Sequence, residues 1–548
     1  MIETCRTSGT SFEISDEDRD FYNKLGIPAP TLCPEERLRR RLCFRNFRSL
    51  YQRTCDLSGK RIISLYEQDA PFPVYDNPLW WSDEWSAQSF SKEIDFSRPF
   101  FEQYHELSNQ VPRYSIMNVN SENCNYSIVA ADSINCYLVY GCVRNENCMY
   151  GHIVWDCEYC LDCLYTYRCQ WCTNGIDLAD CYNVHYSTEC ANCSDSYFLH
   201  DCRNCRDCFG CTNLRGKQYY FFNEYLGEQA YREKLATFFP LNRKTVADGY
   251  QWVEQQREKH AFYPPMFNVN TENVIGNHCY ECENLEQCFD AKDCRDCKYC
   301  YTTFGNSNCY DMSFNGRGGT NYCYEGLTIA GCNEVMFAEQ VFDSSRVLYS
   351  QYCYSGSDLF GCNGLRNAKH CILNKAYTEH EFETLKDKLI SHMKETDEWG
   401  EFFPSKLSPF SYNESIAQEY LPLSKEEVLY RGLSWKDKTA NTSDEPLSTM
   451  PSTAAEVDDS ILEETFLCQK TERPYRIQKQ ELEIRKRLEL PLPVCCPDAR
   501  HEGRMKLRGE RRLWNTTCAE SGKKIVSATN PELVNEVLSD EVYLKRLY

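Results

Sequence analysis

Cysteine recurs at every third position over long stretches of this chain. Residues 201–211 read DCRNCRDCFGC, in which Cys202, Cys205, Cys208 and Cys211 are spaced three residues apart. A strand alternates with a period of two and a helix with a period of about 3.6, so neither keeps every third side chain on one face. The spacing therefore requires a different repeating backbone.

The triplet spacing extends far beyond this stretch. Sixteen cysteines share one triplet phase: Cys124, Cys136, Cys142, Cys148, Cys157, Cys160, Cys163, Cys169, Cys172, Cys181, Cys190, Cys193, Cys202, Cys205, Cys208 and Cys211. In rows of twelve residues they stack in columns, and the other residues of the phase are mostly small or aliphatic. The two residues between them are mostly polar. This pattern predicts a narrow solenoid of twelve-residue coils with one residue in three pointing inward.

A second block repeats the plan. MNVNSENCNYS at 117–127 matches FNVNTENVIGN at 267–277, and cysteines from Cys279 to Cys309 keep the triplet phase. The phase slips at the glycine-rich stretch 315–321 and then resumes. Helical patterns at 227–239 and 378–395 follow the two blocks and would cap them. The predicted fold class is mainly β, with two narrow β-solenoids, helical caps and two small ribbon-like modules at the ends.

The two ends of the chain are duplicated. Cys5, Cys33 and Cys55 align without gaps to Cys468, Cys496 and Cys518, within PAPTLCPEER and PLPVCCPDAR, and CDLSGKRIIS and CAESGKKIVS. The framework resembles a zinc ribbon, in which paired C-x-x-C knuckles give four thiolates to the metal. Here each knuckle keeps only its first cysteine, so the alternatives are a metal site and plain packing of a small domain.

The whole chain resembles a family of long cysteine-rich bacterial proteins from reduced genomes, which have zinc-ribbon-like ends around a C-x-x-C repeat region. The shared stretches include IPAPTLCPEERLRRRLCFRN (27–46), WWSDEW (80–85), DFSRPFFEQYHEL (95–107), EFFPSKLSPFSYNES (401–415) and RIQKQELEIRKRLELPLPVCCPDAR (476–500). The resemblance covers nearly the whole chain and implies no particular activity.

These patterns divide the chain into eight segments. They are an N-terminal ribbon-like module (1–65), a connecting segment (66–115), the first repeat region (116–221), a helical cap (222–265), the second repeat region (266–374), a helical cap with an extension (375–436), an acidic, Ser/Thr/Pro-rich linker expected to be flexible (437–460) and a C-terminal ribbon-like module (461–548).

The thiol columns admit two interpretations. Inward cysteines fill a narrow interior as small apolar groups, or the densest rows bind zinc or another thiophilic metal. The metal candidates are Cys202, Cys205, Cys208, Cys211, Cys157, Cys160, Cys163, Cys169, Cys172, Cys294, Cys297, Cys300, Cys5, Cys33, Cys55, Cys468, Cys496 and Cys518. Many rows hold only one or two cysteines, and this dilution favours packing.

Arginines cluster in the end modules of a chain whose net charge is −21. Such clusters with interleaved aromatic residues suit phosphate backbones, but the same arginines can pair with the many acids of the chain. The candidate nucleic-acid contacts are Arg37, Arg39, Arg40, Arg41, Arg45, Arg48, Arg504 and Arg508. Replacing Arg39, Arg40 and Arg41 by glutamate is expected to leave the fold intact.

Three functions remain open at this point. The first is a non-enzymatic scaffold or interaction protein with a protein partner, the second a nucleic-acid-associated protein, and the third a redox enzyme that uses the cysteine rows. No phosphate loop, G-x-S-x-G elbow or H-E-x-x-H pair occurs, and His152, His185, His200 and His278 fall at outward positions. Without a secretion signal or an apolar run long enough to span a membrane, we expect a cytoplasmic protein with reduced thiols and no membrane partner.

Overall fold

The computed structural model of the 548-residue chain describes residues 1–315, 324–327, 336–437 and 448–548. The phase slip expected at 315–321 lies, apart from Asn315, outside the described residues. The chain divides into two compact units, each made of two separate stretches of sequence. Unit 1 comprises residues 1–116 and 266–436, and unit 2 comprises residues 117–265 and 437–548.

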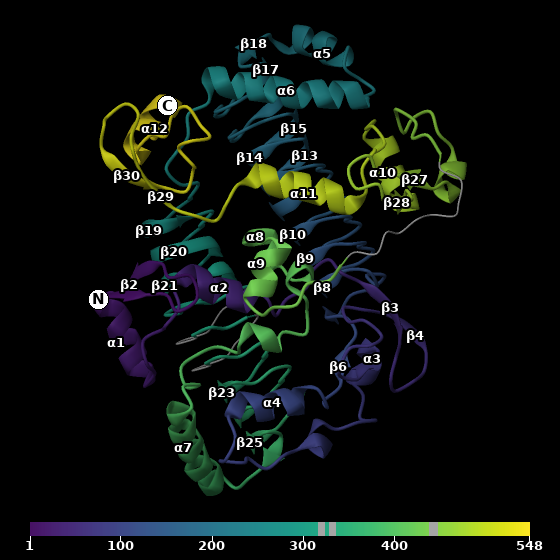
Figure 1. The fold of residues 1–548 in the computed structure, drawn as a ribbon. Helices are drawn as coiled ribbons and strands as arrows, with labels where there is room; N and C mark the ends of the chain where they lie inside the picture. The colour runs from purple at the N-terminus through teal and green to yellow at the C-terminus, as the bar shows by residue number, and fades with distance from the viewer. Residues whose placement is uncertain (316–323, 328–335, 438–447) are drawn as a thin grey trace. The chain divides into compact units, whose positions relative to one another are not determined.

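Unit 1 joins the N-terminal module to the second repeat region (Figure 1). Its helices are α1 (Asp16–Leu25), α2 (Pro34–Leu42), α3 (Asn77–Trp80), α4 (Phe100–Ser108), α7 (Glu379–Glu395), α8 (Ala417–Tyr420) and α9 (Lys425–Tyr430), with 3-10 turns η1 (Ala87–Phe90), η2 (Ser405–Leu407) and η3 (Tyr412–Glu414). Its strands are β1 (Ile2–Thr4), β2 (Ser11–Glu13), β3 (Tyr51–Thr54), β4 (Arg61–Ser64), β5 (Val74–Tyr75), β6 (Arg113–Tyr114), β19 (Glu272–Asn277), β20 (Glu283–Lys292), β21 (Arg295–Lys298), β22 (Tyr301–Phe304), β23 (Ser345–Leu348), β24 (Ser357–Phe360), β25 (Lys369–Ile372) and β26 (Lys375–Ala376).

Unit 2 joins the C-terminal module to the first repeat region. Its helices are α5 (Glu228–Ala236), α6 (Arg243–His260), α10 (Lys479–Arg487), α11 (Pro497–Arg508) and α12 (Asp540–Leu547), with the 3-10 turn η4 (Asp459–Glu463). Its strands are β7 (Asn118–Val119), β8 (Ile128–Ala131), β9 (Tyr140–Val143), β10 (His152–Trp155), β11 (Leu164–Tyr167), β12 (Ile176–Ala179), β13 (Tyr182–His185), β14 (Thr188–Ala191), β15 (Ser194–Tyr197), β16 (Arg206–Phe209), β17 (Gln218–Phe221), β18 (Glu224–Tyr225), β27 (Phe466–Leu467), β28 (Pro474–Tyr475), β29 (Trp514–Thr517) and β30 (Lys524–Ser527).

The predicted fold class, a mainly β chain built from two narrow β-solenoids, is wrong. Helices take up about 25% of the chain and strands about 27%, so the two are nearly balanced. The strands form small separate sheets, and none of these closes on itself within the described ranges. The prediction gave most weight to the triplet pattern, whereas much of the helix lies in segments with few cysteines.

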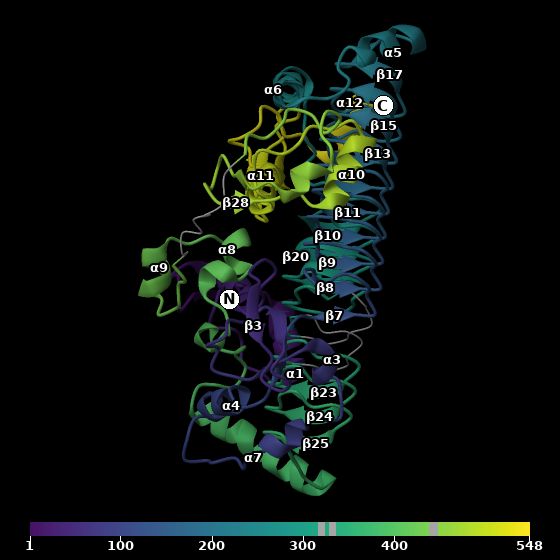
Figure 2. The ribbon, with the colours of Figure 1, turned by 90° about the vertical axis from the view of Figure 1, so that its right-hand side faces the viewer.

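Parallel pairing between short strands organises the first repeat region. Strand β10 pairs with β11 through His152 and Leu164, and β13 pairs with β15 through His185 and Tyr197. In each pair the partners are twelve residues apart, as the rows of the sequence imply. Figure 2 shows strands β8 to β11 following one another in order. The twelve-residue row therefore sets the pairing register, and it connects seven of these short strands in the order β14-β12-β11-β10-β9-β8-β7.

A left-handed backbone residue explains the period of three. Within the first repeat region nearly every third residue has a positive φ, for example Asn135 at 53°, Asn147 at 54° and Asp156 at 56°. This conformation turns the chain after every two extended residues, so the inward side chain recurs at three rather than two. Asparagine and aspartate tolerate it best among residues with a side chain, which accounts for their frequency at this position.

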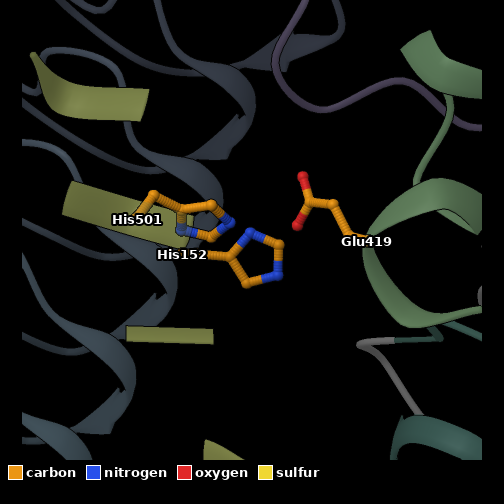
Figure 3. Close-up of side chains that lie close together, drawn as sticks. All are labelled: His152, Glu419 and His501. Carbon is orange, nitrogen blue, oxygen red and sulfur yellow. The ribbon is translucent and has the colours of Figure 1, made fainter. Parts of the chain in front are cut away.

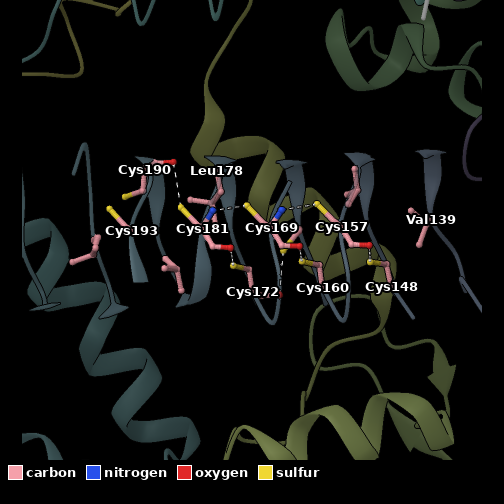
Figure 4. Close-up of a cluster of buried hydrophobic side chains, with 14 of the residues drawn as sticks. Val139, Cys148, Cys157, Cys160, Cys169, Cys172, Leu178, Cys181, Cys190 and Cys193 are labelled. Atoms are coloured by element: carbon pink, nitrogen blue, oxygen red, sulfur yellow. Dashed lines mark hydrogen bonds between the residues drawn. The ribbon is translucent and has the colours of Figure 1, made fainter. Parts of the chain in front are cut away.

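The inward side chains of the first repeat region form one buried cluster. Its cysteines are packed with Val139, Val154, Leu178, Val184 and Leu199. Figure 4 shows thiols of successive rows, among them Cys157, Cys169 and Cys181, following one another along the interior between the strands. The interior is thus filled by sulfur and small aliphatic groups.

Aromatic residues of the first repeat region contact the elements that flank it. Tyr186 stacks on Phe198 with ring centroids 5.1 Å apart, and Phe209 stacks on Phe221 at 4.5 Å. The same cluster includes side chains from α5, α6 and the segment after α10. These aromatic ladders therefore hold the flanking helices, whereas Tyr126 at the start of the region is 41% exposed.

The two end modules have the same order of elements. A hairpin (β1–β2), two helices (α1, α2) and a second hairpin (β3–β4) in the N-terminal module correspond to β27–β28, α10, α11 and β29–β30 in the C-terminal module. The part of the expected linker that the structure describes, 448–460, is packed: Met450 and Ala454 are buried with Ile461 and Phe466.

Candidate functional site

The thiols of the repeat regions act as hydrogen-bond donors to the backbone. Cys157 donates to the carbonyl of Trp155 at 3.2 Å and to that of Thr166 at 3.5 Å. The same pattern, two residues back and nine residues ahead, recurs at Cys160, Cys172 and Cys211. A thiol that donates in this way keeps its proton, so the geometry stabilises neutral side chains.

Burial reinforces this preference for the neutral thiol. Loss of solvation raises the pKa of Cys288 to about 11, that of Cys371 to about 11 and that of Cys353 to about 12. Metal coordination needs the thiolate. Burial at these three positions therefore opposes the charge state that a metal ligand requires, whereas hydrogen bonds from neighbouring thiols lower the pKa of Cys136 to about 4 and, against burial, that of Cys172 to about 6.

The predicted metal ligands of the repeat regions are all buried but do not form compact donor sets. They are Cys157, Cys160, Cys163, Cys169, Cys172, Cys202, Cys205, Cys208, Cys211, Cys294, Cys297 and Cys300. Neighbouring thiols contact one another in chains, as from Cys202 through Cys205 to Cys208. In the part of the chain that the structure describes, no three cysteine sulfur atoms lie mutually within 4.8 Å.

The thiols of the end modules lie in a different setting. Cys5, Cys55, Cys468 and Cys518 each begin a tight turn between the two strands of a hairpin. In each turn the cysteine carbonyl accepts a hydrogen bond from the amide of the residue four positions later, at 2.9 Å. In these turns the sulfur accepts hydrogen bonds. Ser58 N donates to Cys55 Sγ at 3.5 Å, and Ser521 N donates to Cys518 Sγ at 3.4 Å.

A helix N-terminus faces each of these knuckle turns. Cys33 is the N-cap of α2 and Cys496 the N-cap of α11, and they approach Cys5 and Cys468 respectively. Cys55 instead accepts a hydrogen bond from the amide of Asp76, the N-cap of α3, at 3.3 Å. Each module therefore contains one knuckle turn whose cysteine lies beside the thiol of a helix N-cap, and one knuckle turn with a single thiol.

The pKa values of the knuckle thiols Cys55, Cys468 and Cys518 are lowered. Burial raises the pKa of Cys518, but the hydroxyl and amide of Ser521 and further backbone amides outweigh it and bring the pKa to about 6. The corresponding donors around Cys468, beginning with Thr471, bring its pKa to about 7 against the effect of burial. Hydrogen bonds to Ser58 lower the pKa of Cys55 in the same way.

These donor sets do not fit tetrahedral zinc. A structural zinc site takes four ligands from two complete knuckles. The second knuckle positions here are Ser8, Glu36, Thr471 and Ala499, and Cys55 and Cys518 lie in knuckles of their own. The zinc that the resemblance to a ribbon implies therefore lacks its ligand set.

The arginines of α2 form a buried clamp on the second repeat region. Arg37 Nε and Arg41 Nη1 each bind a carboxylate oxygen of Asp311 at 2.9 Å. All three side chains are almost fully buried. A buried charge is costly unless it is paired, so the clamp fixes the N-terminal module on its repeat region within unit 1.

The same clamp recurs in unit 2. Arg500 and Arg504 of α11, which align with Arg37 and Arg41, bind Asp162 at 2.6 and 2.9 Å, and Arg485 adds a third contact at 3.2 Å. Burial raises the pKa of Asp162, but these guanidinium groups outweigh it and hold the pKa below its usual value. Asp162 and Asp311 both have a positive φ. The duplication of the end modules thus includes the arginine–aspartate contact that holds each module on its repeat region.

The other predicted nucleic-acid residues are mostly engaged inside the protein. Arg39 binds Glu35, Glu36 and Tyr412, Arg40 binds Glu325 and Glu401, and Arg508 binds Asp177. Arg45 lies over the rings of Phe47 and Phe314, and Arg48 is half-buried. The expectation that three glutamates in place of Arg39, Arg40 and Arg41 leave the fold intact needs correction, because the substitution would place new charges beside Glu325 and Asp311.

The histidines expected on the surface are buried. His152 and His185 are fully enclosed, and His200 and His278 are nearly so. Figure 3 shows His152 beside His501 of α11, with ring centroids 5.2 Å apart. His185 contacts Thr173 Oγ1 at 2.8 Å, and burial lowers its pKa to about 3. These outward positions are covered by the flanking elements, which the sequence pattern did not reveal.

A cavity of about 860 Å³ lies in unit 1. Its lining includes three arginines and two glutamates that form ion pairs. Arg39 and Arg431 pair with Glu36, and Arg40 pairs with Glu401. The cavity lining contains no cysteine. The charges that line it are therefore largely committed to holding α2 in place.

Sequence comparisons add no relative: the chain matches no family model and no curated protein. Among the described residues, no helix combines the length and the apolar character needed to cross a bilayer.

Proposed function

We propose that this chain is a non-enzymatic scaffold or interaction protein that binds a protein partner. The observation that carries the proposal is the state of the repeat-region thiols, which are buried and donate hydrogen bonds to backbone carbonyls. A thiol used in this way stabilises the polypeptide and is withheld from nucleophilic or redox chemistry. The repeat regions then serve as rigid supports for the modules clamped on them.

The support itself is stiffened by side-chain ladders on its outer face. Arg144 binds Asp156 in the next row through two hydrogen bonds, and Arg168 binds Asp180 in the same manner. Beside them Trp155 and Tyr167 are half-exposed, with ring centroids 6.2 Å apart. Exposed aromatic groups bordered by charge are common at protein interfaces. This face is therefore the one that we assign to a protein partner.

The metal part of the proposal is confined to the end modules. Their knuckle sulfur atoms accept hydrogen bonds from turn amides, whereas the repeat-region thiols also donate hydrogen bonds to backbone carbonyls. A nucleic-acid role is not carried forward, because most arginines that motivated it are buried in ion pairs.

Chelation and thermal unfolding together test the scaffold. A strong chelator should leave the melting temperature and circular dichroism of the full chain unchanged, because the repeat regions are held by packing and hydrogen bonds. Unfolding on chelation, with metal released in stoichiometric amount, would show instead that a metal holds the fold.

A pull-down with the Trp155→Ala variant tests the face that we assign to a protein partner. The Tyr182→Ala variant is the control, because Tyr182 is also an exposed aromatic residue. Loss of the partner in the Trp155→Ala variant alone supports the assignment of this face.

A further inference from the structure

Each end module brings two thiols together from two different elements. In the N-terminal module Cys5 comes from the β1–β2 turn and Cys33 from the start of α2. Both are buried in one small cluster, and their thiols are within hydrogen-bonding reach of each other. The Ser8 hydroxyl lies 3.8 Å from Cys33 Sγ.

The C-terminal module repeats this pair and adds a third thiol. Cys468 comes from the β27–β28 turn and Cys496 from the start of α11, with the Thr471 hydroxyl 3.6 Å from Cys496 Sγ. Cys495 packs against the same cluster and is half-buried, and its thiol reaches that of Cys468. The two ends of the chain have thus kept the same pair of sulfur atoms in the same setting.

We propose that these pairs, Cys5 with Cys33 and Cys468 with Cys496, are binding sites for a monovalent soft cation, Cu(I). Thiolates select soft ions, and Cu(I) is satisfied by two or three thiolates where zinc requires four ligands. Backbone amides of the turns and of the helix starts surround the sulfur atoms and offset their negative charge. On loading, the two thiols lose their protons to solvent and the cation takes the place of those protons between the sulfur atoms.

Cys55 and Cys518 provide an internal contrast. They sit in turns of the same construction, with equivalent amide donors, but a second thiol is missing from their described surroundings: Asp76 and Ser539 occupy the helix starts that face them. A single sulfur atom leaves Cu(I) under-coordinated. These two cysteines should therefore bind no copper of their own.

Titration of the reduced full chain with Cu(I), under anaerobic conditions and against a chromophoric Cu(I) chelator, tests the inference. We expect each end module to withdraw one equivalent of Cu(I) from the chelator. The C5S/C33S variant should lose one equivalent and C468S/C496S the other, whereas the C55S/C518S control should retain both. The Cys495→Ser variant should give up its C-terminal copper at a lower chelator concentration than the parent.

A measurement on the unmodified chain guards against variants that fail to fold. One loaded equivalent per module should protect Cys5, Cys33, Cys468 and Cys496 from alkylation, as resolved by mass spectrometry. Failure of the parent to compete with the chelator, or copper uptake that persists in both double variants, would overturn the inference. The inference rests on the confinement of metal to the end modules, but the chelation test of the scaffold uses melting rather than copper uptake, so the two can fail separately.

Discussion

The first repeat region and the C-terminal module place the same side chain in different settings. In the repeat region Cys157 donates hydrogen bonds to carbonyl oxygens and accepts one from the amide of Cys169, whereas in the module Cys518 accepts a hydrogen bond from the amide of Ser521. The first arrangement ties the thiol to carbonyl oxygens inside a packed interior, and the second surrounds the sulfur atom with the donors of a tight turn. The hydrogen-bond partners of a thiol, and not only the density of cysteine, therefore bear on what that thiol can do.

The largest effect is expected where the two parts meet inside unit 2. Asp162→Asn removes the charge that three buried arginines share, and breaking such a site costs about 3–5 kcal/mol. The matched control is Asp180→Asn, which loses an exposed pair with Arg168 and should cost about 1 kcal/mol or less. Denaturant unfolding measures both. Equal losses in the two variants would contradict the clamp.

A second prediction concerns the filled interior. Cys169→Leu adds volume to a fully buried position of the first repeat region, and overpacking of this kind costs about 1–3 kcal/mol. The control, Cys495→Leu, enlarges a half-buried thiol of the module and should cost less. The midpoint of urea unfolding reports the difference. A tolerated leucine at position 169 would show that the interior has room to spare.

Serine offers a finer comparison. Ser187 and Ser196 already occupy inward positions of the first repeat region and donate to carbonyls two residues back, at 2.8 and 2.7 Å. Cys181→Ser should therefore retain its hydrogen bond and cost about 1 kcal/mol or less. Thermal unfolding tests this. A collapse of stability would indicate that sulfur at this position has a role that a hydroxyl cannot fill.

The smallest effect on stability is expected from titration of Cys518. Because its folded pKa of about 6 lies below the ordinary value of about 8.5, its thiolate stabilises the fold at high pH. That contribution is lost as the pH falls through about 6. The thiolate absorbance of the parent minus that of Cys518→Ser should show this midpoint. A midpoint near the ordinary value would mean that the turn amides leave the sulfur unperturbed.

The spacing of cysteine was enough to predict that Cys157, Cys169 and Cys181 would be buried, and they are. The prevalence of asparagine and aspartate at the third position could have indicated the left-handed residue, as at Asn147 and Asp156. The fold class could not be predicted in this way, because helices outside the repeat regions leave no trace in the triplet pattern.

The arginine–aspartate clamps could not be predicted from the sequence for a different reason. Arg41 and Asp311 are far apart in the sequence, and nothing in the pattern around either residue names the other as its partner. The arginine cluster was visible, but only the fold shows that it faces inward. The thiol pairs of the modules were visible as aligned cysteines, whereas the separation of Cys55 from Cys5 and Cys33 emerged only in three dimensions.

Alkylation of the native, reduced chain, followed residue by residue with mass spectrometry, tests the central contrast most directly. The account predicts that Cys5, Cys55, Cys468 and Cys518 react first, because their turns favour the thiolate, and that repeat-region cysteines such as Cys169 and Cys288 react only as fast as the chain unfolds. Modification of the repeat-region cysteines at the same rate as the knuckle cysteines, in a chain that stays folded, would contradict it.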